Sequence, residues 1–187
     1  MLRFLPAVLV AGLAVAPALA DEFTDTLDSA IKAYNDGDVA GAQQDVEYAG
    51  KLLTAMKAEG LAKFLPAAQD GWTRADQNVE EAGGVMAMIG GGTTTGATYK
   101  KADGTEMTIT LVANSPMVSG IAAMIGGMAS MGGGKPMRIE RTEFANNDGE
   151  LQGVVDGKVM ITVAGDATVE DKTAYLEAMD FKGLAEF

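Results

Sequence analysis

The sequence predicts an α+β protein, in which an N-terminal antiparallel helical hairpin precedes an antiparallel sheet of about six strands, covered on one face by two helices. Three observations predict this fold: apolar residues recur at helical spacing early in the chain, apolar and polar residues alternate later, and Asp-Gly pairs separate the alternating segments. The expected order after the hairpin is β-β-β-α-β-β-β-α. We expect a signal peptide at 1–20, the helical hairpin at 21–66, a linker at 67–82 and the α+β domain at 83–187.

Residues 1–20 have the three parts of a secretory signal peptide. Arg3 supplies a positive charge, an apolar run of about a dozen residues follows, and the sequence Ala-Leu-Ala ends at Ala20. A retained membrane anchor is the weaker interpretation, because the run is shorter than the roughly 20 residues that a spanning helix needs. We therefore expect cleavage between Ala20 and Asp21, residence in the bacterial periplasm or full secretion, and no integral membrane span in the mature chain.

The composition excludes several kinds of function. The chain has no His and no Cys, so it cannot form His-based acid–base pairs, Cys nucleophiles, disulfides or the usual zinc sites. The 167 residues after the signal peptide carry 13 basic and 26 acidic side chains, which makes nucleic acid and anionic membranes poor partners. We expect no cofactor and no catalytic residue.

Two apolar patterns predict the helices of the hairpin. The spacing is helical in Phe23, Leu27, Ala30, Ile31 and Tyr34, and again in Val39, Ala42, Val46, Ala49, Leu53 and Met56. Between the two patterns, Gly37 suits the left-handed conformation that ends a helix, and Asp38 suits the cap of the next helix. The sequence therefore predicts a tight turn at this point.

One part of the hairpin resembles a known repeat. Residues 28–53 are similar to a single tetratricopeptide-type hairpin, in the residues Tyr34, Gly37, Asp38, Ala42, Val46 and Ala49. Such repeats need about three copies to bury a continuous core, so the resemblance implies a docking appendage with Tyr34, Gly37 and Ala42 on its partner surface. The alternative is a generic antiparallel helix pair with close-packed alanines.

Alternation predicts strands around Val85–Ile89, Met107–Leu111 and Val159–Val163, with hairpin turns at three Asp-Gly pairs: Asp103-Gly104, Asp148-Gly149 and Asp156-Gly157. One helix is expected after Pro116, running toward Gly132, and another starting at Thr168. Together with this topology, the Gly71-Trp72 entry resembles secreted PsbP-type α/β proteins, a likeness that carries no active-site residue. Trp72 and Tyr99 are candidates either for a ligand groove or for core anchors.

The segment 117–132 offers two further candidate sites. Met124, Met128 and Met131 share one helical face, and three thioethers would suit Cu(I), although Met is also an adaptable core filler. A ridge of small residues, Ala122, Gly126 and Ser130, would permit close contact with a partner.

The function that these features favour is an exported, non-catalytic binding or scaffolding protein. Its partner would be another periplasmic protein, with a homo-oligomer as the alternative. A Met-based Cu(I) or small-ligand carrier is the second hypothesis. A hydrolase with a carboxylate pair across a cleft is the third, because 26 acidic residues offer many combinations.

The first prediction concerns processing. We expect the exported protein to begin at Asp21, because Ala-Leu-Ala precedes it in the position that signal peptidase recognises. Amino-terminal sequencing of the protein from a periplasmic fraction measures this directly. Recovery of protein that begins at Met1 would contradict it.

Overall fold

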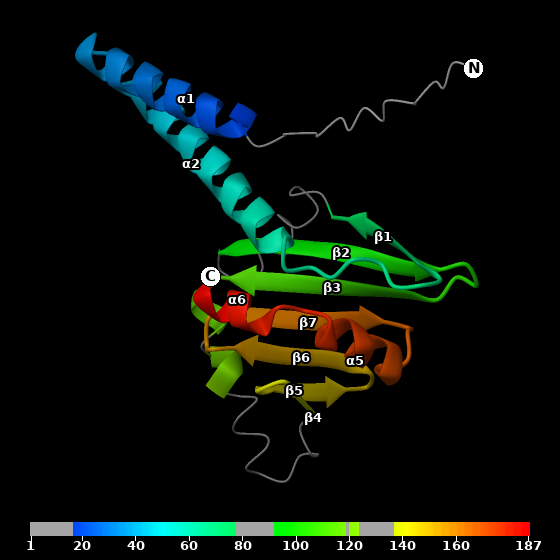
Figure 1. Ribbon diagram of the computed structural model, residues 1–187. Coiled ribbons are helices and arrows are strands. Elements are labelled where there is room, and N and C mark those ends of the chain that lie inside the picture. The colour runs from blue at the N-terminus through cyan, green and yellow to red at the C-terminus, as the bar shows by residue number, and fades with distance from the viewer. Residues whose placement is uncertain (1–16, 78–91, 119, 124–136) are drawn as a thin grey trace, which may run out of the picture. The chain divides into compact units, whose positions relative to one another are not determined.

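The computed structural model describes residues 17–77, 92–118, 120–123 and 137–187, and the chain divides into two compact units between Leu53 and Thr54 (Figure 1). The first unit holds two helices. The second holds an antiparallel sheet of seven strands and the C-terminal helices. The predicted α+β class is therefore confirmed.

The first unit is a helical hairpin. Its helices are α1 (Pro17–Asn35) and α2 (Val39–Ala62), and the second of these continues into the other unit. Gly37 has a φ of 83°, and the Asp38 carboxylate accepts a hydrogen bond of 2.9 Å from the backbone nitrogen of Gly41. The turn and cap that the sequence predicts are thus confirmed. Helix α1 runs through the expected cleavage site between Ala20 and Asp21.

Small side chains fill the seam between the helices. Ala30 of α1 and Ala42, Ala49 and Leu52 of α2 are buried. The seam agrees with the generic pair of helices that pack through alanines.

The sheet has the order β1-β2-β3-β7-β6-β5-β4, with every neighbouring pair antiparallel. Its strands are β1 (Trp72–Asp76), β2 (Thr93–Lys101), β3 (Glu106–Ala113), β4 (Met137–Ile139), β5 (Thr142–Asn147), β6 (Glu150–Val155) and β7 (Val159–Gly165). The expectation of about six strands is corrected to seven in the described residues. The strand expected at 85–89 lies outside them.

Two of the seven strands have weak sequence signals. Strand β1 lies within the stretch that we assigned to a linker, and as an edge strand it carries the polar residues Thr73, Arg74 and Asp76. Strand β4 is three residues long, and Glu140 enters the turn after it with a φ of 53° although no glycine is present. Short, polar or glycine-free elements give little alternation or turn chemistry to detect.

The Asp-Gly turns form as the sequence predicts. In the β5–β6 turn Asp148 and Gly149 have φ values of 51° and 86°, and in the β6–β7 turn Asp156 and Gly157 have 48° and 68°. Two successive positive φ values define the type I′ turn, whose twist matches that of the strands it joins.

The main core lies on one face of the sheet, beneath α5 (Val169–Glu177) and α6 (Phe181–Glu186) (Figure 1). Thr168 caps α5, as expected, by accepting a hydrogen bond from the backbone nitrogen of Asp171. Helix α6 is additional to the sequence prediction. Its Phe181 stands edge-on to Phe144 of β5, whose ring in turn lies against Gly153 of β6.

The helical segment formed by residues 116–118 and 120–123 corrects the prediction that both helices cover the same face. Its Val118 packs with Val112 of β3 and Met160 of β7, which alternate with residues of the main core and so point to the opposite face. Alternation shows that a strand has two faces, but it does not show to which face the connecting chain returns.

A buried lysine joins three elements of the second unit. Lys172 of α5 is 1% exposed, and its ammonium group donates hydrogen bonds of 2.6 Å to the carbonyl of Gly149 and 2.7 Å to that of Gly165. Gly165 ends β7 with a φ of 116°, and a Cβ there would collide with the backbone carbonyl of Glu106. Lys172 therefore fixes α5 to a turn and to a strand end that no bulkier residue can form.

The second prediction follows from this contact. Lys172→Met should lower the free energy of unfolding by about 1–3 kcal/mol, because a buried side chain loses two charge-assisted hydrogen bonds that hold α5 to the sheet. Lys182→Met, on the exposed side of α6, is the matched control and should change it by less than about 0.5 kcal/mol. Urea denaturation followed by circular dichroism measures both, and equal effects of the two variants would contradict the role of Lys172.

Candidate functional site

The hairpin exposes large apolar side chains. In the described part of the chain, the large hydrophobic residues with high exposure are Ile31, Tyr34, Val39, Val46, Tyr48 and Leu53 of the hairpin, together with Met117 and Phe187. Most of them thus belong to one small unit. Clustered exposure of this kind marks interaction surfaces more often than single exposed residues do.

Five of these residues lie on one side of the hairpin. Each helical residue lies about 100° around the helix axis from the residue before it. In a pair of antiparallel helices, the residue directly after an inward-facing one therefore points to the same side of the pair, whichever of the two helices it belongs to. Ile31 follows the buried Ala30, and Leu53 follows the buried Leu52. The other members are Tyr34, Val39 and Val46, and we call these five residues the apolar face; they are between 42% and 68% exposed.

The opposite side of the hairpin is polar. A groove of about 540 Å³ is lined by Asp21, Glu22, Asp25, Thr26, Ser29, Asp45 and Tyr48, and we call it the acidic groove. The Tyr48 hydroxyl donates a hydrogen bond of 2.6 Å to the Glu22 carboxylate, which places these two residues on the same side. This bond and the charge of Glu22 raise the pKa of Tyr48 above its ordinary value.

The predicted partner residues have different surroundings. Tyr34 is the most exposed of the large apolar residues on the hairpin, and Gly37 lies in its turn, whereas Ala42 is buried in the alanine seam. Ala122 is half-buried in the segment 116–123. The remaining candidates lie outside the described residues: Gly126 and Ser130 of the small-residue ridge, and Met124, Met128 and Met131 of the proposed Cu(I) site.

Of the five residues of the apolar face, only Tyr34 was among the partner residues that the sequence predicted. A signal was present, because Val39, Val46 and Leu53 follow one another at intervals of seven and Ala42 and Ala49 form a second row beside them. Rows at these spacings are the a and d positions of a heptad, which can face one neighbouring helix together, so the pattern alone does not show which row is buried. The alanine row is the buried one.

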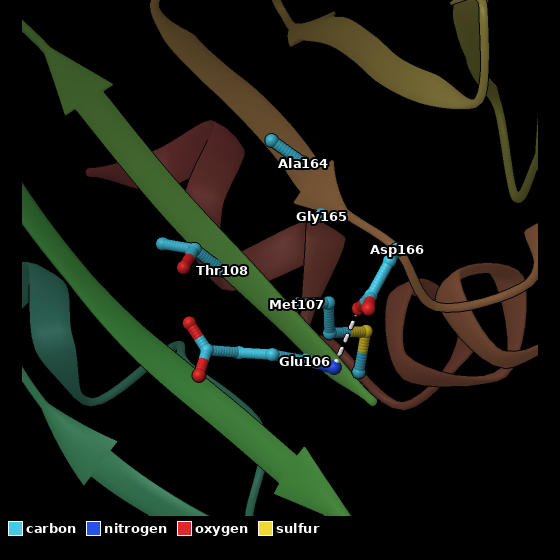
Figure 2. A pocket seen from close by; sticks show the side chains of 6 residues that line it. All are labelled: Glu106, Met107, Thr108, Ala164, Gly165 and Asp166. Atoms are coloured by element: carbon cyan, nitrogen blue, oxygen red, sulfur yellow. Dashed lines mark hydrogen bonds between the residues drawn. The ribbon is translucent and has the colours of Figure 1, made fainter. Parts of the chain in front are cut away.

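Two carboxylates border a cavity of about 330 Å³ in the second unit, which Figure 2 shows at the start of β3 and the end of β7. Glu106 points toward Thr108 and forms an ion pair of 3.5 Å with Lys100. Asp166 accepts a hydrogen bond of 2.6 Å from the backbone nitrogen of Glu106. Both side chains thus support the junction between the strands, and this arrangement adds nothing to the hydrolase hypothesis.

A larger cavity, of about 660 Å³, lies at the other end of the second unit. Its walls are Glu140, Arg141, Thr142, Val155, Asp156, Phe181, Lys182 and Ala185. The border carries charges of both signs, so the cavity does not select a ligand by charge.

Two negative findings apply to the described residues only. They contain no group of three or more Asp and Glu side chains placed to hold a metal ion. Among them there is also no helix with the length and apolar character needed to cross a membrane.

Trp72 and Tyr99 anchor the core rather than line a groove. Tyr99 is fully buried, and its hydroxyl donates a hydrogen bond of 2.6 Å to the carbonyl of Pro66. The rings of Trp72 and Tyr99 both pack against that of Tyr175, at 5.6 and 4.6 Å between centroids. Burial raises the pKa of Tyr99 to about 12.

Comparison of the chain with family models, with curated proteins and with solved structures finds no match.

The third prediction concerns alkaline stability. The pKa of Tyr99 is raised from 10.0 to about 12 on folding. The contribution of this shift to the free energy of unfolding is therefore complete below pH 10 and is lost as the pH rises through 12. The free energy of unfolding should fall by up to about 1.4 kcal/mol per pH unit in this window from Tyr99 alone. The free energy of unfolding of Tyr99→Phe should fall less steeply with pH. In that variant, Arg74 still donates a hydrogen bond to the carbonyl of Pro66. Urea titrations at a series of alkaline pH values test this, and parallel profiles for the two proteins would contradict it.

Proposed function

We propose that this is an exported, non-catalytic binding protein that docks another periplasmic protein through the apolar face of its hairpin. The observation that carries the proposal is the exposure of five large apolar side chains on one side of two helices. Export is supported by the signal-peptide pattern at 1–20. The absence of His and Cys from the sequence supports a function in binding rather than catalysis.

The energy available from the apolar face indicates a reversible contact. Full burial of a Val, Leu or Ile side chain contributes about 1.5–3 kcal/mol, so completing the burial of five half-exposed residues contributes roughly 5 kcal/mol. Association itself costs an estimated 4–15 kcal/mol. Apolar contact alone is therefore marginal, and a specific complex needs additional interactions at the border of the face.

The fourth prediction tests the docking surface. Val46→Asp places a charge at the centre of the apolar face, and it should abolish retention of the partner by the tagged full-length mature protein in an envelope extract of the source bacterium. Gln44→Asp is the matched control, because it adds the same charge to an exposed position on another side of α2. Mass spectrometry identifies the retained proteins, and circular dichroism checks that both variants are helical.

Retention of the same proteins by wild type, Val46→Asp and Gln44→Asp would sink the proposal. Loss with both variants would also count against it, because the effect would then follow charge and not the apolar face.

A further inference from the structure

The charges around the apolar face indicate what kind of partner it accepts. The face is bordered by Asp28 on α1, Glu47 on α2, and Asp36 and Asp38 at the turn, all of them exposed. Residues 21–53 contain eight carboxylates and two lysines, Lys32 and Lys51. On α1, Lys32 lies farther around the helix from Ile31 than Asp28 does. On α2, Lys51 lies farther around the helix from Val46 than Glu47 does. The border is therefore acidic within residues 21–53, and Lys57, exposed one turn after Leu53 on the same side of α2, adds one basic residue at its end.

The shape of the face indicates a helix. Val39, Val46 and Leu53 form a straight row about 21 Å long, at the seven-residue interval of a coiled-coil seam. Gly50 lies between Val46 and Leu53 and is exposed, and apart from its chain neighbours and the backbone of its own helix no atom lies within 4 Å of the place where its Cβ would be. The row thus has a position without a side chain beside it, where side chains of a third helix have room to pack.

From these two observations we infer that the partner presents an amphipathic helix whose apolar side is flanked by Lys or Arg. The inference rests on the proposed function, since it names the partner of the same face. The helix lies along the row on α2, with Ile31 and Tyr34 of α1 on its other side, and completes a three-helix bundle. Its basic residues meet Asp28 and Glu47 and supply the interactions that apolar contact alone lacks.

A second copy of the hairpin fits this face less well. Two apolar faces in contact would bring two acidic borders together, and opposed like charges disfavour association. Anionic membrane surfaces are repelled for the same reason.

The closing experiment uses two synthetic peptides and the full mature protein. Each peptide is a fluorescein-labelled amphipathic helix about 18 residues long with leucine at the seam positions; one has lysine flanks and the other glutamate flanks. Fluorescence anisotropy at roughly 50 mM salt should show the lysine peptide binding at least about tenfold more tightly. Its affinity should fall at least about tenfold with Val46→Asp and change by less than about twofold with Gln44→Asp.

Reversal of the border charges is the sharper arm. The double variant Asp28→Lys/Glu47→Lys should weaken the lysine peptide and strengthen the glutamate peptide, because attraction and repulsion exchange places. An unchanged order of affinities would overturn the inference.

The remaining outcomes separate this inference from the proposed function. One outcome is that neither peptide binds, or that both bind equally, while Val46→Asp still abolishes retention of a partner from the extract. The inference of a basic partner helix is then overturned, and the proposed docking function stands. Lysine-peptide binding that is insensitive to Val46→Asp means attraction to the acidic groove, which overturns the inference. Sedimentation that shows a dimer lost with Val46→Asp identifies a second copy as the occupant and overturns it as well.

Discussion

The ammonium group of Lys172 lies inside the α+β unit, hydrogen-bonded to the carbonyls of Gly149 and Gly165. A buried charge is stable only where polar atoms replace its water, so the β5–β6 turn and the end of β7 must hold their positions for α5 to dock. Once α5 is held, Tyr175 and Leu176 fill the core above the sheet. The same helix orders the chain that enters β1, because the Tyr175 hydroxyl accepts a hydrogen bond from the backbone nitrogen of Gln69. Lys172 and Tyr175 together thus link the β5–β6 turn, the end of β7 and the chain that enters β1 through one helix.

The hairpin is organised by size rather than by charge. Three of the four buried residues at its seam are alanines and the fourth is Leu52, whereas Ile31, Tyr34 and Val46 are exposed. The exposed apolar side chains of the apolar face lie on one side of the pair, while carboxylates and Tyr48 occupy the other. A hairpin that buries mainly alanines thus leaves its larger apolar residues on its surface.

The sequence contains most of the fold but little of the candidate site. Periodicity and Asp-Gly chemistry are local, and they predicted the hairpin, strands β3 and β7, the turns and the start of α5. Strand β1 depends on a partner far along the chain, β4 is too short to show alternation although its partner β5 follows directly, and the side on which Val118 packs depends on the whole sheet. Lys172 resembles any surface lysine until α5 is placed on the sheet. The apolar face was visible as a second row on α2, but only burial shows which row is inside.

The stack formed by Gly153, Phe144 and Phe181 crosses from one strand to the next and then to a helix. The Phe144 ring occupies the space that a side chain at position 153 would need, and Phe181 stands on that ring. The position of α6 on the sheet therefore depends on the absence of a side chain at Gly153, in the middle of β6. A substitution that adds even a methyl group at this position must move the Phe144 ring, and with it the last helix of the chain.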